Sequence, residues 1–177
     1  LEVGDLIYLS GEKIYVVAMA STAKKIVEKT EAGKPLFDLK GSVIYQCPIS
    51  VRKVNEKYRV QWVGATTSIM SEGVIPDLIR LGARAIMGKG GMGEKTLNAL
   101  KKYGAVYLAT VGATSSLLTR YVVRIVNMYD PTLVFPLCEL ELRDFGPVVV
   151  GMDSHGRNLF DEVWNKARRK VAEIISA

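Results

Sequence analysis

A glycine-rich segment offers the clearest candidate for chemistry in this sequence. The segment GKGGMG, residues 88–93, follows an apolar run and precedes a run of helix-forming residues. Glycines let a backbone approach a ligand closely, and the N–H groups at the start of a helix attract anions. We therefore predict a carboxylate or phosphate site formed by Lys89, Gly90 and Gly91. A tight turn between a strand and a helix, without a ligand, is the alternative.

This segment partly matches two nucleotide-binding motifs but lacks a required residue of each. Gly88, Gly90 and Gly93 have the spacing G-x-G-x-x-G. A dinucleotide site also needs an acidic residue at the end of the next strand, and the expected strand over residues 105–112 has none. A P-loop would need glycine where Glu94 stands. The sequence therefore does not predict nucleotide binding.

The remaining reactive residue types form no second site. His155 is the only histidine, and its neighbours Asp153 and Ser154 lack a G-x-S-x-G motif or a third orienting group. We expect this segment to be a structural turn. The two cysteines, Cys47 and Cys138, are far apart in the sequence and cannot supply the four thiolates of an iron–sulfur cluster. We expect them to be buried thiols in a reducing compartment, the cytoplasm.

Hydrophobic patterning predicts an α/β chain of short strands and helices. We expect strands over residues 5–10, 13–18, 42–47, 58–63, 83–88, 105–112, 121–126, 137–144 and 147–153. We expect helices over residues 21–33, 72–82 and 93–104. Residues 30–41 are predicted to be a surface connector and not a domain boundary.

A C-terminal helix is predicted from apolar residues that recur with helical spacing. These residues are Phe160, Val163, Trp164, Ala167, Val171 and Ile174. Such a stripe is typical of a helix packed on a core, so we expect this helix to be docked. Trp62 and Trp164 are expected to be core aromatics.

Charge and hydropathy narrow the class of partner. The formal net charge is +6, but the basic residues are scattered and not interleaved with aromatics, so we expect a small anion or an acidic protein and not nucleic acid. No apolar run approaches the roughly 20 residues that cross a bilayer. Glu2, Asp5 and Glu12 interrupt any signal-peptide core near the start.

Five stretches of this sequence resemble the beta subunit of class I fumarase and L-tartrate dehydratase, and they occur in the same order as in that family. They are GDLIYLSG, DLKGSVIYQCP, GATTS (residues 64–68), GKGGMG and DFGPVVVGMDSHGRNL. Because they cover nearly the whole chain, residues 1–177 are predicted to be a single domain of this type. The resemblance implies a swivelling β/β/α domain with a mixed sheet and flanking helices.

The same resemblance implies a function. This family adds or removes water on a small dicarboxylate such as fumarate, malate or tartrate. The chain would pair with an alpha subunit that carries a 4Fe–4S cluster, and would itself bind no metal. Thr66 would be the base, while Thr67 and Ser68 would donate to a substrate carboxylate. Lys89 matches the family's glycine-loop lysine, a charge aimed at the substrate.

Several charged positions of the family are replaced here. Where the family reads A-R-D-x-A-H, residues 18–23 read Ala-Met-Ala-Ser-Thr-Ala. The arginine beyond the family's GPTTS loop falls on Met70, and a family glutamate falls within residues 134–136. Losing two arginines removes bidentate carboxylate contacts that lysine cannot fully replace.

Three functional hypotheses follow. The chain is a hydro-lyase beta subunit without activity on its own, a non-catalytic scaffold subunit, or a stand-alone binder of small anions through residues 88–93. The first is favoured by the resemblance. A homodimer of the chain and the identity of the dicarboxylate are left open.

Overall fold

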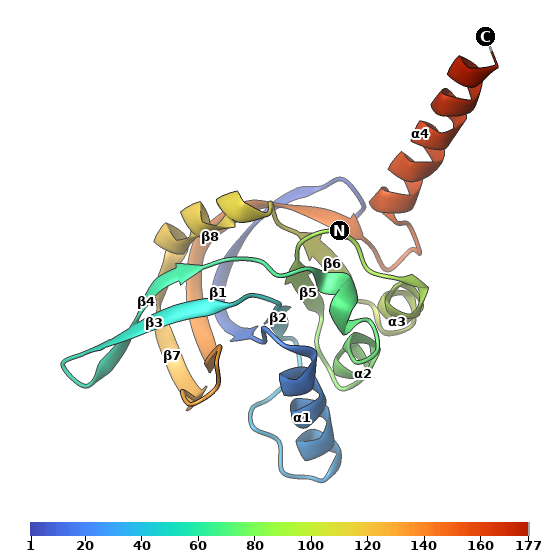
Figure 1. Ribbon diagram of the computed structural model, residues 1–177. Coiled ribbons are helices and arrows are strands. Elements are labelled where there is room, and N and C mark those ends of the chain that lie inside the picture. Colours follow the sequence, from blue (N-terminus) through green and yellow to red (C-terminus); the bar gives the residue numbers. More distant parts are fainter. Residues whose placement is uncertain (177) are drawn as a thin grey trace.

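The chain forms a curved mixed β-sheet with helices packed against one side (Figure 1). The computed structural model describes residues 1–176, apart from the side chains of residues 113–115. The helical segments are α1 (Ala20–Glu31), η1 (Ser68–Ser71), α2 (Ile75–Arg80), α3 (Glu94–Tyr103), η2 (Ala113–Tyr121) and α4 (Leu159–Ile175). The strands are β1 (Leu6–Val16), β2 (Val43–Tyr45), β3 (Ile49–Val54), β4 (Lys57–Val63), β5 (Ala85–Gly88), β6 (Val106–Ala109), β7 (Val122–Asp130) and β8 (Leu137–Met152). The predicted α/β class, with a mixed sheet and flanking helices, is confirmed; the swivelling-domain assignment stays a prediction.

The main sheet closes on itself. Its strand order is β1-β2-β5-β6-β8-β7, with β1, β2, β5 and β6 parallel and β8 antiparallel to β6 and β7. β8 also pairs with β1, from Leu6 opposite Val149 to Val16 opposite Cys138. The two ends of the parallel set are therefore joined through β8, and β1, β2, β5, β6 and β8 make a ring.

Side chains of the central strands alternate between two hydrophobic clusters. Ile44 on β2 and Ile86 on β5 pack with α1, α2 and α3. Their neighbours Tyr45 and Met87 point the other way, into a second cluster that includes Phe145 of β8. Strands that are buried on both faces read as continuous apolar runs, which is why these segments were recognisable from the sequence.

Two long strands replace four predicted short ones. The predicted strands at residues 5–10 and 13–18 join as β1, and those at 137–144 and 147–153 join as β8. Within β1, Gly11 has a φ of 125° and the pairing with β8 shifts register on both sides of it. The glycine therefore bends the strand without ending it, as bulges in antiparallel pairs do.

Two predictions about burial are wrong. The connector over residues 30–41 is not confined to the surface, because Phe37 is buried and stacks on Tyr15 with ring centroids 3.8 Å apart. Trp62 is not a core aromatic, since it lies on the β3–β4 hairpin with 41% of its surface exposed. The hairpin is a separate two-stranded sheet, so one of its faces has little to pack against.

The C-terminal helix is present, but the prediction that it docks on the core is wrong. Its first turn touches the domain through Phe160, whose ring lies edge-on to Tyr107 with centroids 6.4 Å apart. Residues 161–176 are all exposed, Trp164 among them, and α4 projects away from the sheet (Figure 1). Neither α4 nor any other helix in residues 1–176 has the length and apolar character to cross a membrane.

A buried carboxylate joins the start of the chain to the turn before α4. Asp153 accepts hydrogen bonds from the backbone N–H groups of Val3 (3.0 Å), His155 (2.9 Å) and Arg157 (3.0 Å). Burial by itself raises the pKa of Asp153, but these three donors outweigh it and hold the pKa below its ordinary value. His155 lies in this turn, as predicted from the sequence, and is exposed.

We expect Asp153→Asn to lower the free energy of unfolding at pH 7 by roughly 1.5–3 kcal/mol. The donors approach both carboxylate oxygens, and an amide offers only one acceptor, so one N–H would face an NH2 group. Because the folded pKa is depressed, this stabilisation is present above the unfolded pKa of about 3.9 and is lost as the pH falls through the folded value.

Urea unfolding at pH 7 and at pH 3 measures the effect. The difference between the wild type and Asp153→Asn should shrink at pH 3. Asp144→Asn is the control, because Asp144 is exposed and its φ of 53° suits asparagine. An equal difference at both pH values would contradict the role of the ionised carboxylate.

Candidate functional site

The two segments singled out from the sequence lie side by side at the carboxyl end of the parallel strands. Thr67 and Lys89 form an isolated parallel bridge. The Lys89 N–H donates to the Thr66 carbonyl and the Ser68 N–H donates to the Lys89 carbonyl, and the N···O distance is 3.1 Å in both hydrogen bonds. Lys89 directly follows β5, so the loop of residues 64–68 continues the sheet beyond the end of that strand. The carboxyl ends of parallel strands are where both open sheets and closed barrels generally bind ligands.

The three hydroxyl residues of the loop have different environments. The N–H of Thr66 donates to the Gln46 carbonyl with an N···O distance of 2.9 Å, so the loop is hydrogen-bonded to the residue that follows β2. Thr66 is half-buried, Thr67 is exposed and Ser68 is fully buried. The Tyr107 hydroxyl donates to Ser68 Oγ, with an O···O distance of 2.9 Å. Solvent therefore reaches the Thr66 and Thr67 side chains, whereas the Ser68 hydroxyl is turned into the core, away from the position expected of a substrate contact.

Close packing and backbone conformation account for three glycines of the GKGGMG segment. A Cβ on Gly88 would overlap Ser68 Oγ. A Cβ on Gly91 would lie 2.9 Å from the Phe160 ring, closer than side chains pack. Gly90 has a φ of 72°, in the region that favours glycine. The glycines thus serve the turn between β5 and α3, whether or not a ligand binds there.

The anion at the start of α3 is the chain's own Glu72. Its carboxylate accepts from the Gly93 N–H (3.0 Å), the Thr96 N–H (2.9 Å) and the Thr96 hydroxyl (2.6 Å). A Cβ on Gly93 would lie 2.8 Å from Glu72 Oε1, so the glycine makes room for the carboxylate. The expectation that the helix start is free for an external anion is therefore wrong, because an internal carboxylate already uses these donors.

Lys89 remains available as a cation. Its side chain is half-buried and forms no ion pair with the residues that the structure describes. Its Cδ lies 4.0 Å from the point where a Cβ on Gly112 would stand, so the stem runs from the end of β5 toward the segment after β6. An unpaired ammonium at the carboxyl edge is suited to a substrate carboxylate.

Gln46 was not recognised from the sequence as a site residue. It is 1% exposed at the end of β2, and within residues 1–176 its Oε1 has no hydrogen-bond partner. That oxygen lies 3.2 Å from the Cβ position of Gly88, directly beneath the loop pair. An unpaired buried acceptor costs about 1–3 kcal/mol. The available signal was a polar residue that closes an otherwise apolar strand.

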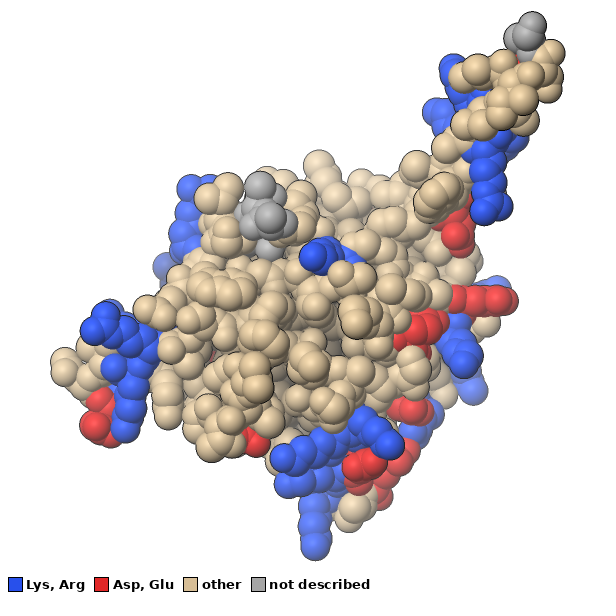
Figure 2. All heavy atoms as spheres, in the orientation of Figure 1, with Lys and Arg blue, Asp and Glu red and all other residues tan. Residues whose placement is uncertain are grey.

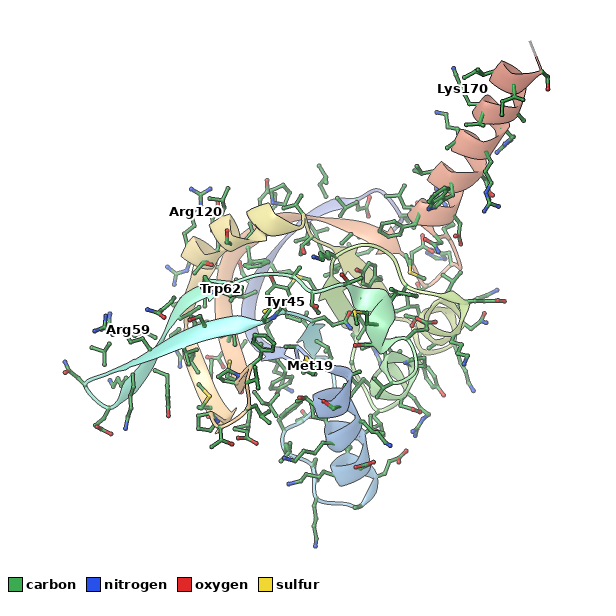
Figure 3. The ribbon with its side chains drawn as sticks, in the orientation of Figure 1. Met19, Tyr45, Arg59, Trp62, Arg120 and Lys170 are labelled. Atoms are coloured by element: carbon green, nitrogen blue, oxygen red, sulfur yellow. The ribbon has the colours of Figure 1, made fainter. Side chains whose placement is uncertain are left out.

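The rim of the carboxyl edge is apolar. Met19 follows β1, Met70 lies in η1 and Val111 follows β6, and all three are exposed. Figure 3 marks Met19 and Trp62, and in the same view Figure 2 shows a face whose centre is largely uncharged, with Lys, Arg, Asp and Glu gathered around it. The site therefore offers Lys89, hydroxyls and backbone groups within an uncharged surround.

Two hollows in the structure lie away from the loop pair. One, of about 740 Å³, is lined mainly by residues of β4 and β7. The other, of about 380 Å³, is a shallow hollow on α4 beside Trp164. Neither includes Thr66, Thr67 or Lys89, so the anion site predicted at Lys89, Gly90 and Gly91 stays a prediction.

The two cysteines do not fit an iron–sulfur cluster in this chain. Cys47 and Cys138 are buried in the second hydrophobic cluster. Burial raises the pKa of both thiols, that of Cys138 to about 12. Two cysteines are also fewer than the four thiolates that usually hold a cluster. In the described part of the chain no group of three or more His, Cys, Asp or Glu side chains is placed to hold a metal ion.

Comparison with known protein families identifies a related family. Residues 1–163 match the family model described as "Fumarase C-terminus". The matched range contains the whole sheet, the loop of residues 64–68 and the GKGGMG segment.

Individual relatives carry related names. A protein of Methanocaldococcus jannaschii, provisionally named as L(+)-tartrate dehydratase subunit beta, is 39% identical over 99% of this chain and 91% of its own length. L(+)-tartrate dehydratase subunit beta of Escherichia coli is 30% identical over 92% of this chain and 80% of its own length. A protein of Geobacillus stearothermophilus, provisionally named as class I fumarate hydratase, is 32% identical, and this chain corresponds to 33% of its length.

We expect Glu72→Ala to lower the free energy of unfolding by roughly 1.5–3 kcal/mol, because it leaves the Gly93 and Thr96 donors at the start of α3 without their anion. The matched control is Glu94→Ala, which removes an exposed acid from the first turn of the same helix. Urea unfolding of both variants and the wild type measures the difference. Equal effects of the two substitutions would mean that Glu72 acts only as a nearby charge.

Proposed function

Because the chain belongs to the Fumarase C-terminus family and is of the beta-subunit type of class I fumarase and tartrate dehydratase, we propose that it works in an iron–sulfur-dependent hydro-lyase that acts on a small dicarboxylate. Its relatives are named as hydro-lyases, which supports the reaction class. The observation that carries the proposal is the bridge between Thr67 and Lys89, which holds hydroxyls and a cation together at the carboxyl edge.

Lys89 is proposed as the substrate anchor. Its ammonium forms no ion pair with the described residues. Its backbone is held in place, because the Lys89 N–H donates to Thr66 and the Lys89 carbonyl accepts from Ser68. A carboxylate held by Lys89 would lie beside the exposed Thr67, whose hydroxyl can donate to it. Gly90 and Gly91 let the carboxylate approach the backbone without a side-chain clash.

Thr66 is proposed as the proton-transfer group. A threonine hydroxyl is a weak base in water, so this role needs a neighbouring charge that stabilises the deprotonated form. We propose that the Lys89 ammonium supplies that charge; the Lys89 N–H donates to the Thr66 carbonyl, so the two residues are neighbours. Ser68 is proposed to shape the loop through its bond to Tyr107, and its hydroxyl reaches substrate only after that bond is broken.

The 4Fe–4S cluster is proposed to belong to a partner alpha subunit, because this chain has two cysteines and a cluster usually takes four thiolate ligands. A cluster in a hydro-lyase supplies a Lewis acid for substrate oxygens. The partner would also supply the carboxylate anchors that Met19 and Met70 do not provide here. Two free buried thiols fit a reducing compartment, and we propose the cytoplasm.

The two competing hypotheses make different predictions about the start of α3 and about Lys89. A stand-alone anion binder that uses the start of α3 is disfavoured, because Glu72 already occupies those donors. A non-catalytic scaffold subunit would not need Lys89 or Thr66 for the activity of the complex.

The test is activity of the complex with its cluster-bearing partner. We expect Lys89→Ala to lower kcat/KM for the dicarboxylate by roughly 10- to 150-fold, the value of one charge-assisted hydrogen bond. We expect Thr66→Val to lower kcat by about 10²- to 10⁴-fold, the usual contribution of an acid–base group. Lys95→Ala is the control, because Lys95 is an exposed lysine in the first turn of α3.

Full activity of both variants in an intact complex would leave this chain the role of a scaffold. Complex formation is followed by gel filtration, so that a loss of assembly is separated from a loss of catalysis.

The isolated chain is expected to bind fumarate or malate weakly, and Met70→Arg is expected to strengthen that binding. Each lost charge-assisted hydrogen bond is worth roughly 1.5–3 kcal/mol, so a restored arginine fork should tighten binding about tenfold or more. Calorimetric titration with malate measures both forms, and Met70→Leu controls for the change of side chain. No gain with arginine would place the anchors on the partner subunit.

A further inference from the structure

The hollow of about 740 Å³ between β4 and β7 runs along the edges of these two strands. Successive side chains of a strand point to opposite faces, so a hollow against one face would touch alternate residues. This hollow instead touches every residue from 57 to 60 on β4 and every residue from 122 to 126 on β7. It therefore lies against the backbone edges of both strands, where N–H and C=O groups are placed to form hydrogen bonds.

Both edges are without a partner strand in the part of the chain that the structure describes. β4 pairs with β3 in the two-stranded sheet, and β7 is the last strand of the main sheet, beside β8. The β3–β4 hairpin projects beyond the main sheet (Figure 1). A free strand edge is a template for pairing with another chain.

The turn between β3 and β4 decides which groups of β4 face outward. Its two central residues, Asn55 and Glu56, have φ values of 47° and 61°, as in the type I′ turns of hairpins. Residues 54 and 57, which flank this turn, exchange both hydrogen bonds, and the bonding then alternates along the pair. The N–H and C=O groups of Tyr58 and Val60 are therefore directed away from β3, toward the outer edge.

The exposed side chains on this edge of β4 are basic. Lys57 and Arg59 line the hollow and form no ion pair with the residues that the structure describes. Arg59 also lies directly opposite Arg52 of β3, and like charges in opposite positions destabilise a hairpin. Figure 2 shows basic side chains gathered on the hairpin, and Figure 3 marks Arg59. A carboxylate placed beside Arg59 would therefore stabilise the hairpin.

The wall that β7 contributes is mainly apolar. Its Arg124 is already paired with Glu12 (2.7 Å) and Glu141 (2.6 Å). The apolar residues of this wall are Val122, Val123, Ile125, Val126 and Met128. The hollow thus combines a free backbone edge, two unpaired cations on one side and an apolar wall on the other.

We propose that an extended acidic segment of a different protein adds to the outer edge of β4, within this hollow. Its backbone pairs with Tyr58 and Val60, as strands that join a sheet edge do. Residues opposite each other in paired strands share a face, so carboxylates stand beside Lys57 and Arg59. Apolar side chains stand beside Tyr58 and Val60. The occupant is therefore a strand in which acidic and apolar residues alternate.

Backbone and charge together select this occupant. A nucleic acid would neutralise Lys57 and Arg59, but it has no peptide groups to pair with the strand edge. The clearest alternation of acidic and apolar residues in this chain itself, CELEL at residues 138–142, lies in β8 and is already paired with β1 and β7. A second copy therefore has no such strand to offer, and the segment comes from another protein. The inference does not depend on the proposed reaction.

The first test titrates the full chain with a synthetic peptide of alternating glutamate and valine, at about 0.15 M salt to screen distant charges. The peptide is expected to bind, and Arg59→Glu should weaken binding roughly tenfold, because an attraction becomes a repulsion. Lys53→Glu is the matched control, since Lys53 lies on the same hairpin but does not line the hollow. Circular dichroism checks that both variants are folded. No binding to the wild type, or equal losses in the two variants, overturns the proposal.

A second set of probes separates strand pairing from attraction by charge. A peptide of alternating glutamate and proline keeps the carboxylates but lacks N–H donors at the prolines, so it should not bind. A peptide of alternating lysine and valine keeps the strand but reverses the charge, and it should not bind either. If the glutamate–proline peptide or a thymidine oligonucleotide binds as tightly as the glutamate–valine peptide, charge alone holds the ligand and the proposal is wrong.

Amide hydrogen exchange, followed by NMR, locates the added strand. The amides of Tyr58 and Val60 should exchange more slowly when the glutamate–valine peptide is present. The amides of Lys57 and Arg59 should change little, because they already donate to β3. Binding without slower exchange at Tyr58 and Val60 overturns the proposed pairing with β4.

Discussion

The pairing of β8 with β1 is the interaction on which the rest of the structure depends. β8 lies beside β6 with its last residues and beside β1 along almost its whole length, so the parallel strands have no open edge at β1 or β6. Closure buries β2 and β5 on both faces, with α1, α2 and α3 on one side and the second cluster on the other. Polar groups are then left to the strand ends, and the carboxyl end gathers Gln46, Thr66 and Lys89.

The glycines of the GKGGMG segment allow close packing with neighbouring elements, while the Lys89 side chain of the same segment forms no ion pair. Gly88, Gly91 and Gly93 make room for Ser68, Phe160 and Glu72 respectively. Each of these neighbours comes from another element, so the segment joins η1, α3 and α4 at one point. The carboxylate of Glu72 satisfies the start of α3, where an external anion would otherwise be attracted. What remains for a ligand is the Lys89 ammonium.

Membership of a hydro-lyase family and an apolar rim around the site are compatible when two chains complete one pocket. A dicarboxylate needs at least two positive or donor-rich groups, and Lys89 is one such group at the carboxyl edge. Met19, Met70 and Val111 form a surface that an apposed protein can cover, which would strengthen the remaining electrostatic contact by excluding water. The stripe on α4 is a separate apolar surface, at the far end of a helix that leaves the body beside Gly91.

The sequence by itself predicted the central strands β2, β5 and β6, because strands buried on both faces leave continuous apolar runs, but it predicted neither β3 nor η2. It also determined the adjacency of the GATTS and GKGGMG segments, through family resemblance. Only the tertiary structure decided that β1 and β8 are continuous, since that depends on each bending with the other. Glu72 and Thr96 are 24 residues apart, and nothing local indicated that the carboxylate would fill the helix start. The apolar stripe of α4 had a recognisable period, but a period specifies that a face will be buried and not what buries it.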